Sequence, residues 1–269
     1  MLISISDPAD PRLEPFRDVK ERDLIGRRGL FLAEGEVVVR QMLRAGRHSL
    51  EALLLAENRL AKLADVIAAE PRLPVYVAPQ PVFDRVAGFP VHRGVLGLGR
   101  RDDDPGADAL LAAAPKRSAV LVALGIGNHD NIGGLFRNAA AFGVHGVLLG
   151  ADACDPLYRK AIRVSVGASL TTPFARLPPG DDLPARLERH GFTPVALSPG
   201  GSTVLHELRA AERTALIVGA EGPGLPPELL ARCVTAAIPM ASGFDSLNVA
   251  AAAAVALHHL TVAAAPRAR

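Results

Sequence analysis

Three segments in the second half of the chain combine glycine turns with polar side chains that could act on a ligand. GIGNHDNIGGLFRN at 125–138 carries Asn131 and Arg137, and GAEGPGLPPELL at 219–230 carries Glu221. IPMASGFDSLNVAAAAAVALHHL at 238–260 carries Ser246 and Asn248. An amide donates and accepts hydrogen bonds at once, and a guanidinium is a permanent cation whose planar fork suits phosphate. The chemistry that these groups could support is the binding of an anion and the stabilisation of developing negative charge.

The first segment also carries part of a dinucleotide-binding fingerprint. Gly125 and Gly127 have the first two spacings of GxGxxG, and Asp152 follows the next expected strand. The third glycine position, however, is Asp130, and an acid facing a pyrophosphate would repel it. A nicotinamide-dependent oxidoreductase therefore remains only an alternative. Taken singly, the other segments also fit plain structural roles, such as a helix begun by prolines or an N-cap at Asp245 or Ser246.

The apolar runs around these segments predict the elements that position them. SAVLVAL at 118–124 and VHGVLLG at 144–150 are typical of strands, with a helix over 132–143 between them. TPVALS, TALIVGA and TAAIPM predict further strands, and the chain from Ser246 onward predicts the last helix. Strands separated by helices imply a mainly parallel sheet, in which ligands bind at the carboxyl ends of the strands. Each of the three polar segments follows such an end.

The domain organisation follows from a change of composition near the middle. Residues 102–116 begin with three consecutive acids and a Pro-Gly turn signal and continue into an alanine-rich stretch, which is typical of a linker. Before it, short apolar runs alternate with helical patterns, including a helix over 58–69, as in a small α/β sandwich. We therefore expect an α/β protein with an N-terminal domain at 1–101, a linker at 102–117 and a larger domain at 118–269.

Composition and charge exclude several classes of protein. The chain has 269 residues, 49% of them hydrophobic and 22% charged, with a net charge of +2. It lacks the large positive net charge of a protein that binds nucleic acid indiscriminately, so RNA binding would need local basic patches, such as the mixed basic run over 12–28. Cys154 and Cys233 have no CxxC spacing, which indicates neither a zinc site nor a disulfide framework. We expect a cytoplasmic protein, because the N-terminus does not resemble a signal peptide and the apolar stretch at 249–265 is too short and polar to span a bilayer.

Taken together, the three segments resemble the ordered motifs of a known family. NHDNIGGLFRNA, LIVGAEGPGL and IPMASGFDSLNVAAAAAVAL are similar to the three motifs of the SpoU (TrmH-like) RNA 2′-O-ribose methyltransferases. DPLYRKAIRVSVGA, between the first two motifs, also resembles this family. Less specifically, FLAEGEVVVRQML and RGVLGLG are similar to the family's N-terminal substrate-binding domain, whose fold is related to a ribosomal protein.

The resemblance implies a fold, a cofactor and an assembly. It implies a trefoil-knotted α/β domain that works as a homodimer, binds S-adenosylmethionine in a bent shape and requires no metal. The implied cofactor pocket is lined by Leu197, Ser198, Gly219, Ile238, Met240 and Leu247. The implied catalytic and positioning residues are Asn131, Arg137, Glu221, Ser246 and Asn248.

The resemblance also frames the mechanism. The family's proposed base for the ribose hydroxyl falls on Arg137, helped by a substrate phosphate. A guanidinium has a pKa above about 12, so it is normally protonated and unsuited to act as a base. We therefore expect Arg137 to hold the phosphate with two N–H groups and to stabilise the developing alkoxide. Asn131 is expected to position the substrate or its loop. His129 stands where the family often has proline, which leaves open a role for it in substrate choice.

The RNA itself is identified only by analogy. The presence of an N-terminal substrate domain favours ribosomal RNA, such as a guanosine in the large-subunit RNA, because compact members that act on tRNA tend to lack that domain. The alternatives are a tRNA 2′-O-methyltransferase and a non-catalytic RNA-binding member of the same fold.

Overall fold

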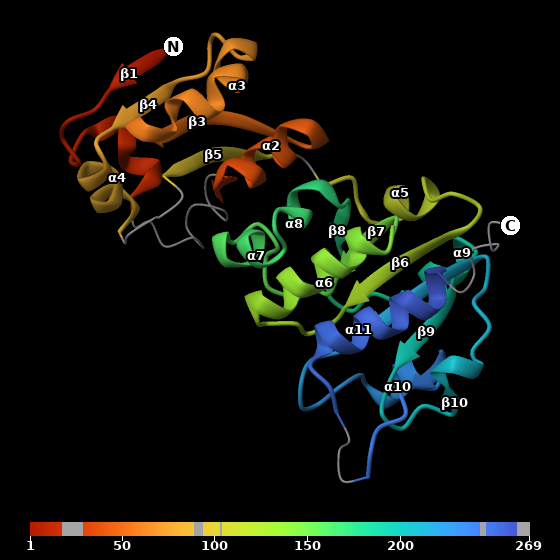
Figure 1. The fold of residues 1–269 in the computed structure, drawn as a ribbon. Helices are drawn as coiled ribbons and strands as arrows, with labels where there is room; N and C mark the ends of the chain where they lie inside the picture. Colours follow the sequence, from red (N-terminus) through yellow and green to blue (C-terminus); the bar gives the residue numbers. More distant parts are fainter. Residues whose placement is uncertain (18–28, 89–93, 103, 243–245, 263–269) are drawn as a thin grey trace, which may run out of the picture. The chain divides into compact units, whose positions relative to one another are not determined.

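The structure is a computed structural model that describes residues 1–17, 29–88, 94–102, 104–242 and 246–262 (Figure 1). Most of the basic run over 12–28 therefore lies outside the described residues. Two compact units are present: Met1–Asp103 with Leu157–Thr171, and Asp104–Pro156 with Thr172–Arg269. The expected division kept residues 157–171 with the second half of the chain, whereas their contacts group them with the first unit. None of the described helices is long and apolar enough to cross a membrane.

The first unit is built on a five-stranded mixed sheet in the order β1-β4-β3-β5-β2. β1, β4 and β3 are parallel, and β5 runs antiparallel to both β3 and β2. The strands are β1 (Leu2–Ser4), β2 (Leu30–Glu34), β3 (His48–Ala56), β4 (Val75–Ala78) and β5 (Val95–Arg101). The helices before residue 104 are α2 (Glu36–Ala45), α3 (Ala64–Ala69) and α4 (Gln80–Ala87), with 3-10 turns at Pro11–Phe16 and Glu57–Leu63. The helix expected over 58–69 is thus a 3-10 turn followed by α3.

Two short helices from the second half of the sequence complete the first unit. α7 (Arg159–Val164) packs on β2, and α8 (Ala168–Thr171) packs on α2. The guanidinium of Arg159 lies 3.1 Å from the carboxylate of Glu34, and the two side chains are only 13% and 9% exposed. Since removing one partner of a buried pair leaves an uncompensated charge, this ion pair holds α7 in one orientation on β2.

The second unit is built on a seven-stranded sheet in the order β10-β12-β9-β11-β6-β7-β8. Every recorded pair in it is parallel, which confirms the predicted mainly parallel sheet. Its strands are β6 (Ser118–Ala123), β7 (Gly146–Leu149), β8 (Phe174–Arg176), β9 (Thr193–Leu197), β10 (Thr203–Val204), β11 (Arg213–Val218) and β12 (Val234–Ala237). Its helices are α5 (Ala107–Ala112), α6 (His129–Ala141), α9 (Leu183–Arg189), α10 (Pro227–Leu230) and α11 (Val249–Leu257), the last followed by a π-helical turn at His258–Val262.

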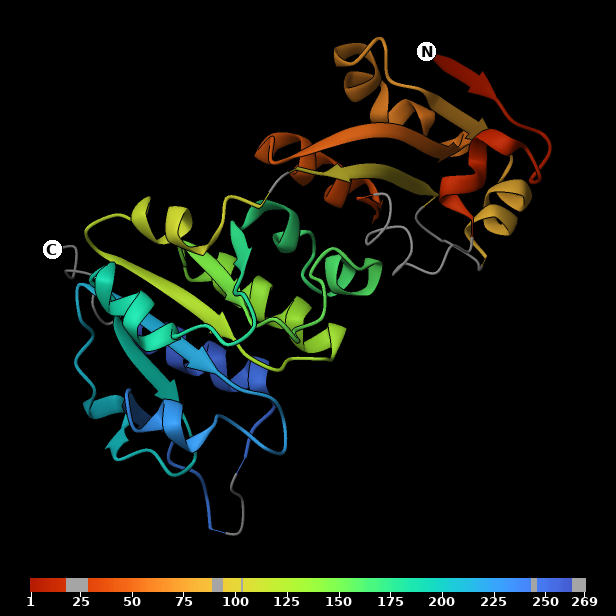
Figure 2. The same ribbon diagram turned by 180° about the vertical axis from the view of Figure 1, so that it is seen from behind.

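Helices cover both faces of this sheet. α6 and α11 lie side by side on one face, and α5 and α9 pack on the other (Figures 1 and 2). α5 falls within the segment expected to be a linker. Its Leu110 and Leu111 are buried with Val120 and Leu187 in the core of the second unit, so apolar burial makes this stretch part of that unit.

The end of α7 carries a strained residue. Val166 has a φ of 54°, so its backbone is left-handed. Among the described residues, it is the one such position that is not a glycine. The N–H of Val166 donates to the carbonyl of Arg163 at 3.1 Å, and the N–H of Gly167 donates to that of Ile162 at 2.9 Å. This is a helix-ending turn in which glycine is the usual residue, because a Cβ there crowds the following carbonyl at a cost of about 1–2 kcal/mol.

Replacing Val166 with glycine should relieve this strain. The side chain is 40% exposed, so little packing is lost. We expect Val166→Gly to raise the free energy of unfolding by about 1 kcal/mol in denaturant titrations. Val37→Gly, a matched change of an exposed valine inside α2, should lower it by up to about 1 kcal/mol. Equal losses in both variants would show that the left-handed turn stores no strain.

Candidate functional site

Three polar side chains from distant parts of the sequence form a closed hydrogen-bonded triangle in the second unit. The amide nitrogen of Asn131 donates to Oε1 of Glu221 at 3.1 Å. The amide nitrogen of Asn248 donates to Oδ1 of Asn131 at 2.8 Å and to the same Glu221 oxygen at 3.1 Å. The three residues belong to the first turn of α6, the loop after β11 and the chain before α11. The triangle therefore joins all three polar segments that the sequence singles out.

Helix capping places two of these side chains. Asn128 caps α6 by accepting from the N–H of Asp130 at 2.8 Å, so Asn131 falls in the first turn, where it is 6% exposed. Asn248 caps α11 by accepting from the N–H groups of Ala250 and Ala251 at 3.0 and 3.3 Å. The expectation that Ser246 or Asp245 caps this helix was wrong for Ser246: α11 begins at Val249, and Asn248 satisfies its first donors. Asp245 lies outside the described residues.

The hydrogen bonds account for both amides almost completely. Asn131 uses its nitrogen on Glu221 and its oxygen on Asn248, while Asn248 uses its oxygen on the helix and its nitrogen on the triangle. An amide whose donors and acceptors are already engaged is poorly placed to bind a substrate as well. Of the two roles expected for Asn131, this geometry favours positioning of the loop.

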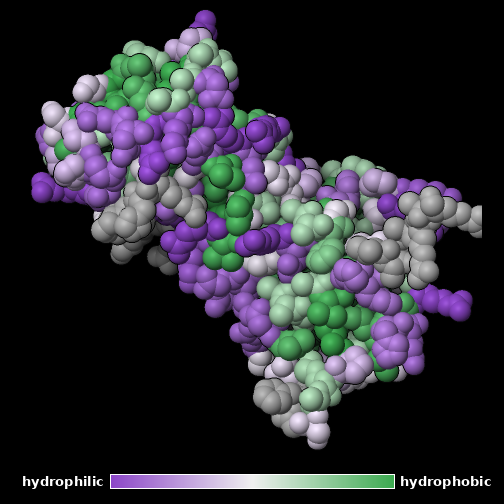
Figure 3. Space-filling view, viewed as in Figure 1, coloured by the Kyte–Doolittle hydropathy of each residue, from purple (hydrophilic) through white to green (hydrophobic). Residues whose placement is uncertain are grey.

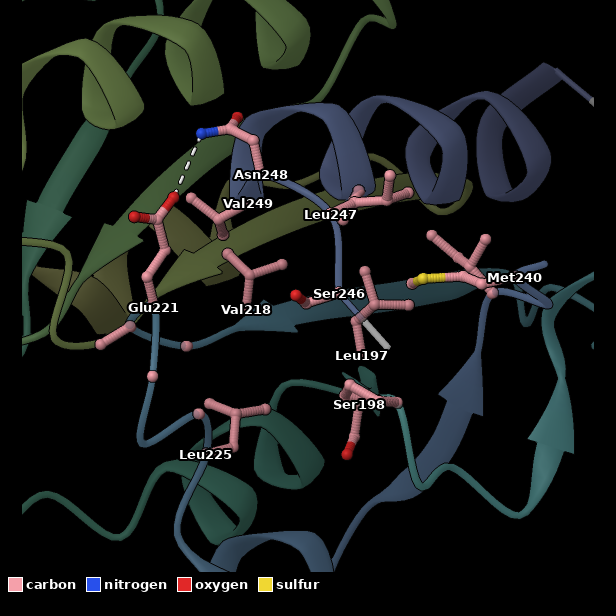
Figure 4. A pocket seen from close by; sticks show the side chains of 17 residues that line it. Leu197, Ser198, Val218, Glu221, Leu225, Met240, Ser246, Leu247, Asn248 and Val249 are labelled. Atoms are coloured by element: carbon pink, nitrogen blue, oxygen red, sulfur yellow. Dashed lines mark hydrogen bonds between the residues drawn. The ribbon is translucent and has the colours of Figure 1, made fainter. Parts of the chain in front are cut away.

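A pocket of about 470 Å³ opens beside the triangle. All six residues expected to hold a cofactor line it: Leu197, Ser198, Gly219, Ile238, Met240 and Leu247. Of the five expected catalytic residues, Glu221, Ser246 and Asn248 line it as well, whereas Asn131 and Arg137 do not. Figure 4 shows Glu221 and Asn248 joined at one end of the pocket and Met240 at the other, with Val218 and Leu197 between them.

The loop after β11 folds tightly to form one wall of the pocket. A Cβ at Gly219 would lie 2.7 Å from the carbonyl carbon of Gly224, a distance that real Cβ atoms do not tolerate. Ala220 and Gly224 form an isolated β-bridge across the turn, and Gly222 and Gly224 have positive φ angles. Only glycine at position 219 lets the chain close on itself here, which brings Glu221 to the edge of the pocket.

Arg137 lies on the same helix as Asn131, about 9 Å further along its axis. It is exposed, and its side chain makes no hydrogen bond or ion pair with the residues that the structure describes. The helix beneath it is fixed firmly. The amide of Asn138 donates to the carbonyl of Ala250 at 2.6 Å, and a Cβ at Gly134 would lie 2.7 Å from that of Ala250. α6 therefore presents a cation to solvent from a rigid support.

The structure adds residues that sequence reasoning missed. Oδ1 of Asp152 accepts from the N–H of Gly125 at 3.1 Å, so it holds the turn that leads into α6. In the sequence Asp152 carried a signal only for a dinucleotide site. The guanidinium of Arg176 donates to the carbonyls of Gly150 and Ala153 at 2.9 and 2.8 Å, which fixes the loop that carries Asp152. A contact of this kind leaves no trace in local sequence patterns.

Metal and thiol chemistry find no support in the described residues. No group of three or more His, Cys, Asp or Glu side chains there could hold a metal ion. Cys154 and Cys233 are both free. Burial raises the pKa of the Cys154 thiol to about 11, so this group stays protonated near neutral pH and is a poor nucleophile.

Comparison with known proteins gives a consistent result. The model of the SpoU rRNA methylase family matches residues 118–258. An uncharacterized tRNA/rRNA methyltransferase of Mycobacterium bovis is 42% identical over 266 residues, which cover 96% of this chain and 91% of the relative. The crystal structure of an rRNA methyltransferase from Sinorhizobium meliloti with bound AdoMet has a similar fold, with a TM-score of 0.85, 22% identity and coverage of 98% and 99% of the two chains. That of an RNA 2′-O ribose methyltransferase has a TM-score of 0.77, 25% identity and coverage of 96% and 98%.

The close approach of α6 and α11 can be tested at Gly134. A methyl group there meets Ala250 at 2.7 Å, so Gly134→Ala should force the helices apart and lower the free energy of unfolding by about 1–3 kcal/mol. Gly127→Ala is the matched control, because nothing lies within 4 Å of its added Cβ and its φ is not positive. Thermal or denaturant unfolding of both variants measures the difference. If the two variants are equally stable, the helices do not pack as closely as described.

Proposed function

The chain belongs to the SpoU rRNA methylase family, and on this premise we propose that it transfers a methyl group from S-adenosylmethionine to a ribose 2′-hydroxyl in a structured RNA. The observation that carries the proposal is the pocket beside the Asn131–Glu221–Asn248 triangle, with Arg137 exposed on the helix that the triangle anchors. The structural similarity to an RNA 2′-O ribose methyltransferase supports the ribose as the acceptor.

The pocket fits S-adenosylmethionine in size and chemistry. Its volume falls in the range of about 300–1,000 Å³ that is usual for small-molecule sites. Leu197, Ile238 and Met240 provide apolar surface for a flat base, and Ser198 provides a hydroxyl. The carboxylate of Glu221 lies at the far end, where it complements a positively charged ligand group. When bound, this cofactor supplies a methyl group on a sulfonium that is already activated, so no metal is needed.

Arg137 is the residue that we assign to the substrate. Methyl transfer requires the attacking oxygen to be held in line at near-attack distance, and the hydroxyl must lose its proton as it reacts. A guanidinium holds a phosphate through two parallel N–H bonds and stabilises a neighbouring alkoxide, while it remains protonated itself. The exposed, unpaired state of Arg137 toward the described residues suits this electrostatic role. It leaves the proton to a substrate phosphate or to water.

The other polar residues have supporting roles in this scheme. Asn131, Glu221 and Asn248 hold the three loops together, and in the family these loops form a trefoil knot, which we propose for this chain as well. Ser246 lines the pocket and is exposed, so its hydroxyl is available to the cofactor or to the RNA. His129 begins α6 and is half-exposed, and its replacement of the family's usual proline leaves open a role in base or substrate choice.

The second unit carries a surface suited to a second copy of the chain. Ala251 and Val255 are exposed on α11, and Val255 remains 46% exposed although it is apolar. Figure 3 shows hydrophobic residues gathered on the face of the second unit to which α11 belongs. Covering this face in a homodimer would remove apolar surface from water. We assign the first unit to RNA binding and the whole protein to the cytoplasm.

Ribosomal RNA is the substrate that we propose in preference to transfer RNA, because the chain has a first unit besides the methyltransferase unit. The name of the relative from Mycobacterium bovis mentions both tRNA and rRNA, so transfer RNA is the second candidate. Mapping of 2′-O-methyl sites in RNA from strains with and without the gene distinguishes the two. We expect one ribose methylation of the large-subunit RNA to disappear. The loss of a tRNA mark alone would select the second candidate, and methylation confined to a base would exclude both.

Arg137→Ala tests the mechanism. We expect it to keep the fold and the affinity for S-adenosylhomocysteine, because Arg137 lies outside the pocket lining, while methyl transfer falls by about 100-fold or more. Titration calorimetry and a radiolabelled transfer assay on unmodified RNA measure the two effects. Arg137→Lys keeps the charge without the fork, so it should recover only a small part of the activity. Unchanged turnover of Arg137→Ala would rule out both the base and the electrostatic role.

A further inference from the structure

The segment that leaves the second unit to join the first has an unusual charge. Residues 157–171, LYRKAIRVSVGASLT, contain Arg159, Lys160 and Arg163 and no aspartate or glutamate. The whole chain has a net charge of only +2, so such a local excess of cations stands out. The basic run near the N-terminus, by contrast, is interspersed with acids. A chain without a strong overall field needs a local patch of this kind if it is to bind a polyanion.

The three cations of this segment have different surroundings. Arg159 is turned inward and pairs with the buried carboxylate of Glu34 at 3.1 Å. Lys160 and Arg163 are exposed, and the side chain of Arg163 makes no ion pair or hydrogen bond with any residue that the structure describes. The buried pair therefore fixes the orientation of α7, and this orientation turns the other two cations toward solvent.

Many other arginines in the first unit are neutralised by acids. Arg12 pairs with Asp10, Arg40 with Glu36 and Asp65, and Arg100 with Glu51. Local ion pairs of this kind reduce the field that such cations project into solvent. Arg163, by contrast, has no such partner among the described residues. It lies three positions from Lys160 on a helix, where like charges are neighbours and repel each other weakly. An anion bound across the two side chains would relieve that repulsion.

We propose that the exposed side of α7, at Lys160 and Arg163, binds the phosphate backbone of the RNA substrate. Two cations on one face of a helix match two phosphate groups and carry no information on the base, so the contact contributes affinity and orientation rather than sequence selection. This inference rests on the proposed function for the identity of the polyanion. It adds a binding surface that is part of neither the pocket lining nor the three motifs.

The position of α7 in the chain links such a contact to the segment that holds the start of α6. The preceding residues, 150–156, belong to the second unit and hold the turn before α6: Asp152 accepts from the N–H of Gly125, and the N–H of Cys154 donates to the carbonyl of Ile126 at 2.9 Å. RNA held on α7 would therefore engage a segment covalently continuous with the loop that secures α6. Because α6 carries Arg137, the backbone contact and the reactive site share one stretch of chain.

The test uses the full-length protein and compares two double variants with the same change of charge. Lys160→Gln/Arg163→Gln removes the proposed contact, and Arg72→Gln/Arg85→Gln removes two other exposed arginines of the first unit. The probe is an unmodified large-subunit ribosomal RNA transcript, with its binding measured at several salt concentrations. For the first variant we expect the slope of log affinity against log salt to fall by about 1–2 and the KM for RNA to rise about tenfold near 0.15 M salt. kcat and S-adenosylhomocysteine binding should stay within twofold of wild type.

The control variant should match wild type in all of these measurements. An equal loss in both double variants would mean that only net charge matters, and an unchanged slope in the first would mean that α7 does not touch RNA. Either result overturns the proposal. If Lys160→Gln/Arg163→Gln unfolds, the same RNA-binding measurement is made on the two single variants and on Arg163→Lys. Arg163→Lys conserves the charge, so it must retain RNA binding. Failure of the wild type to methylate RNA would refute the proposed function alone, because the salt dependence of binding is measured without turnover.

Discussion

The second unit depends on one small polar network, the triangle of Asn131, Glu221 and Asn248. Its members lie up to 117 positions apart in the sequence, yet each accepts or donates at about 3 Å. A neutral hydrogen bond contributes only about 1 kcal/mol and one to a charged carboxylate about 1.5–3 kcal/mol, but a buried polar group left without its partner costs about 1–3 kcal/mol. Asn131, which is buried, therefore needs Glu221 and Asn248, and the three segments are held together at one edge of the sheet.

The sheet makes that meeting possible. All its recorded strand pairs run parallel, so the carboxyl ends share an edge, and β6 lies beside β11. The loops after these two strands thus start as neighbours, whereas β12, the strand that precedes Asn248, is separated from β11 by β9. α6 and α11 then have to pack closely for Asn131, in the first turn of α6, and Asn248, the cap of α11, to reach Glu221, and the absence of a side chain at Gly134 allows this approach. Gly134 lets α11 approach α6, and Asn248 at the start of α11 then reaches Glu221.

Much of this architecture could be predicted from local sequence patterns, and the rest could not, for a physical reason. Apolar runs such as SAVLVAL predicted the strands, and their order predicted the parallel sheet. The cap of α11 was misassigned because serine, aspartate and asparagine are nearly equivalent N-caps, and only the position of Glu221 makes Asn248 the better choice. Residues 157–171 belong to the first unit through contacts with distant parts of the chain, such as the pairing of Arg159 with Glu34, 125 positions away, and local periodicity does not reveal such contacts.

The excursion of residues 157–171 means that the two units are not separable parts. A fragment that begins at residue 104 would contain the whole parallel sheet, but its α7 and α8 would have lost the strand and helix on which they pack. Ala161, Ile162 and Leu170 would face water, and Arg159 would lose its ion pair with Glu34. A fragment that ends at residue 103 would lose the same cover from the other side. Truncation of this chain at the apparent boundary would therefore expose apolar surface on both fragments.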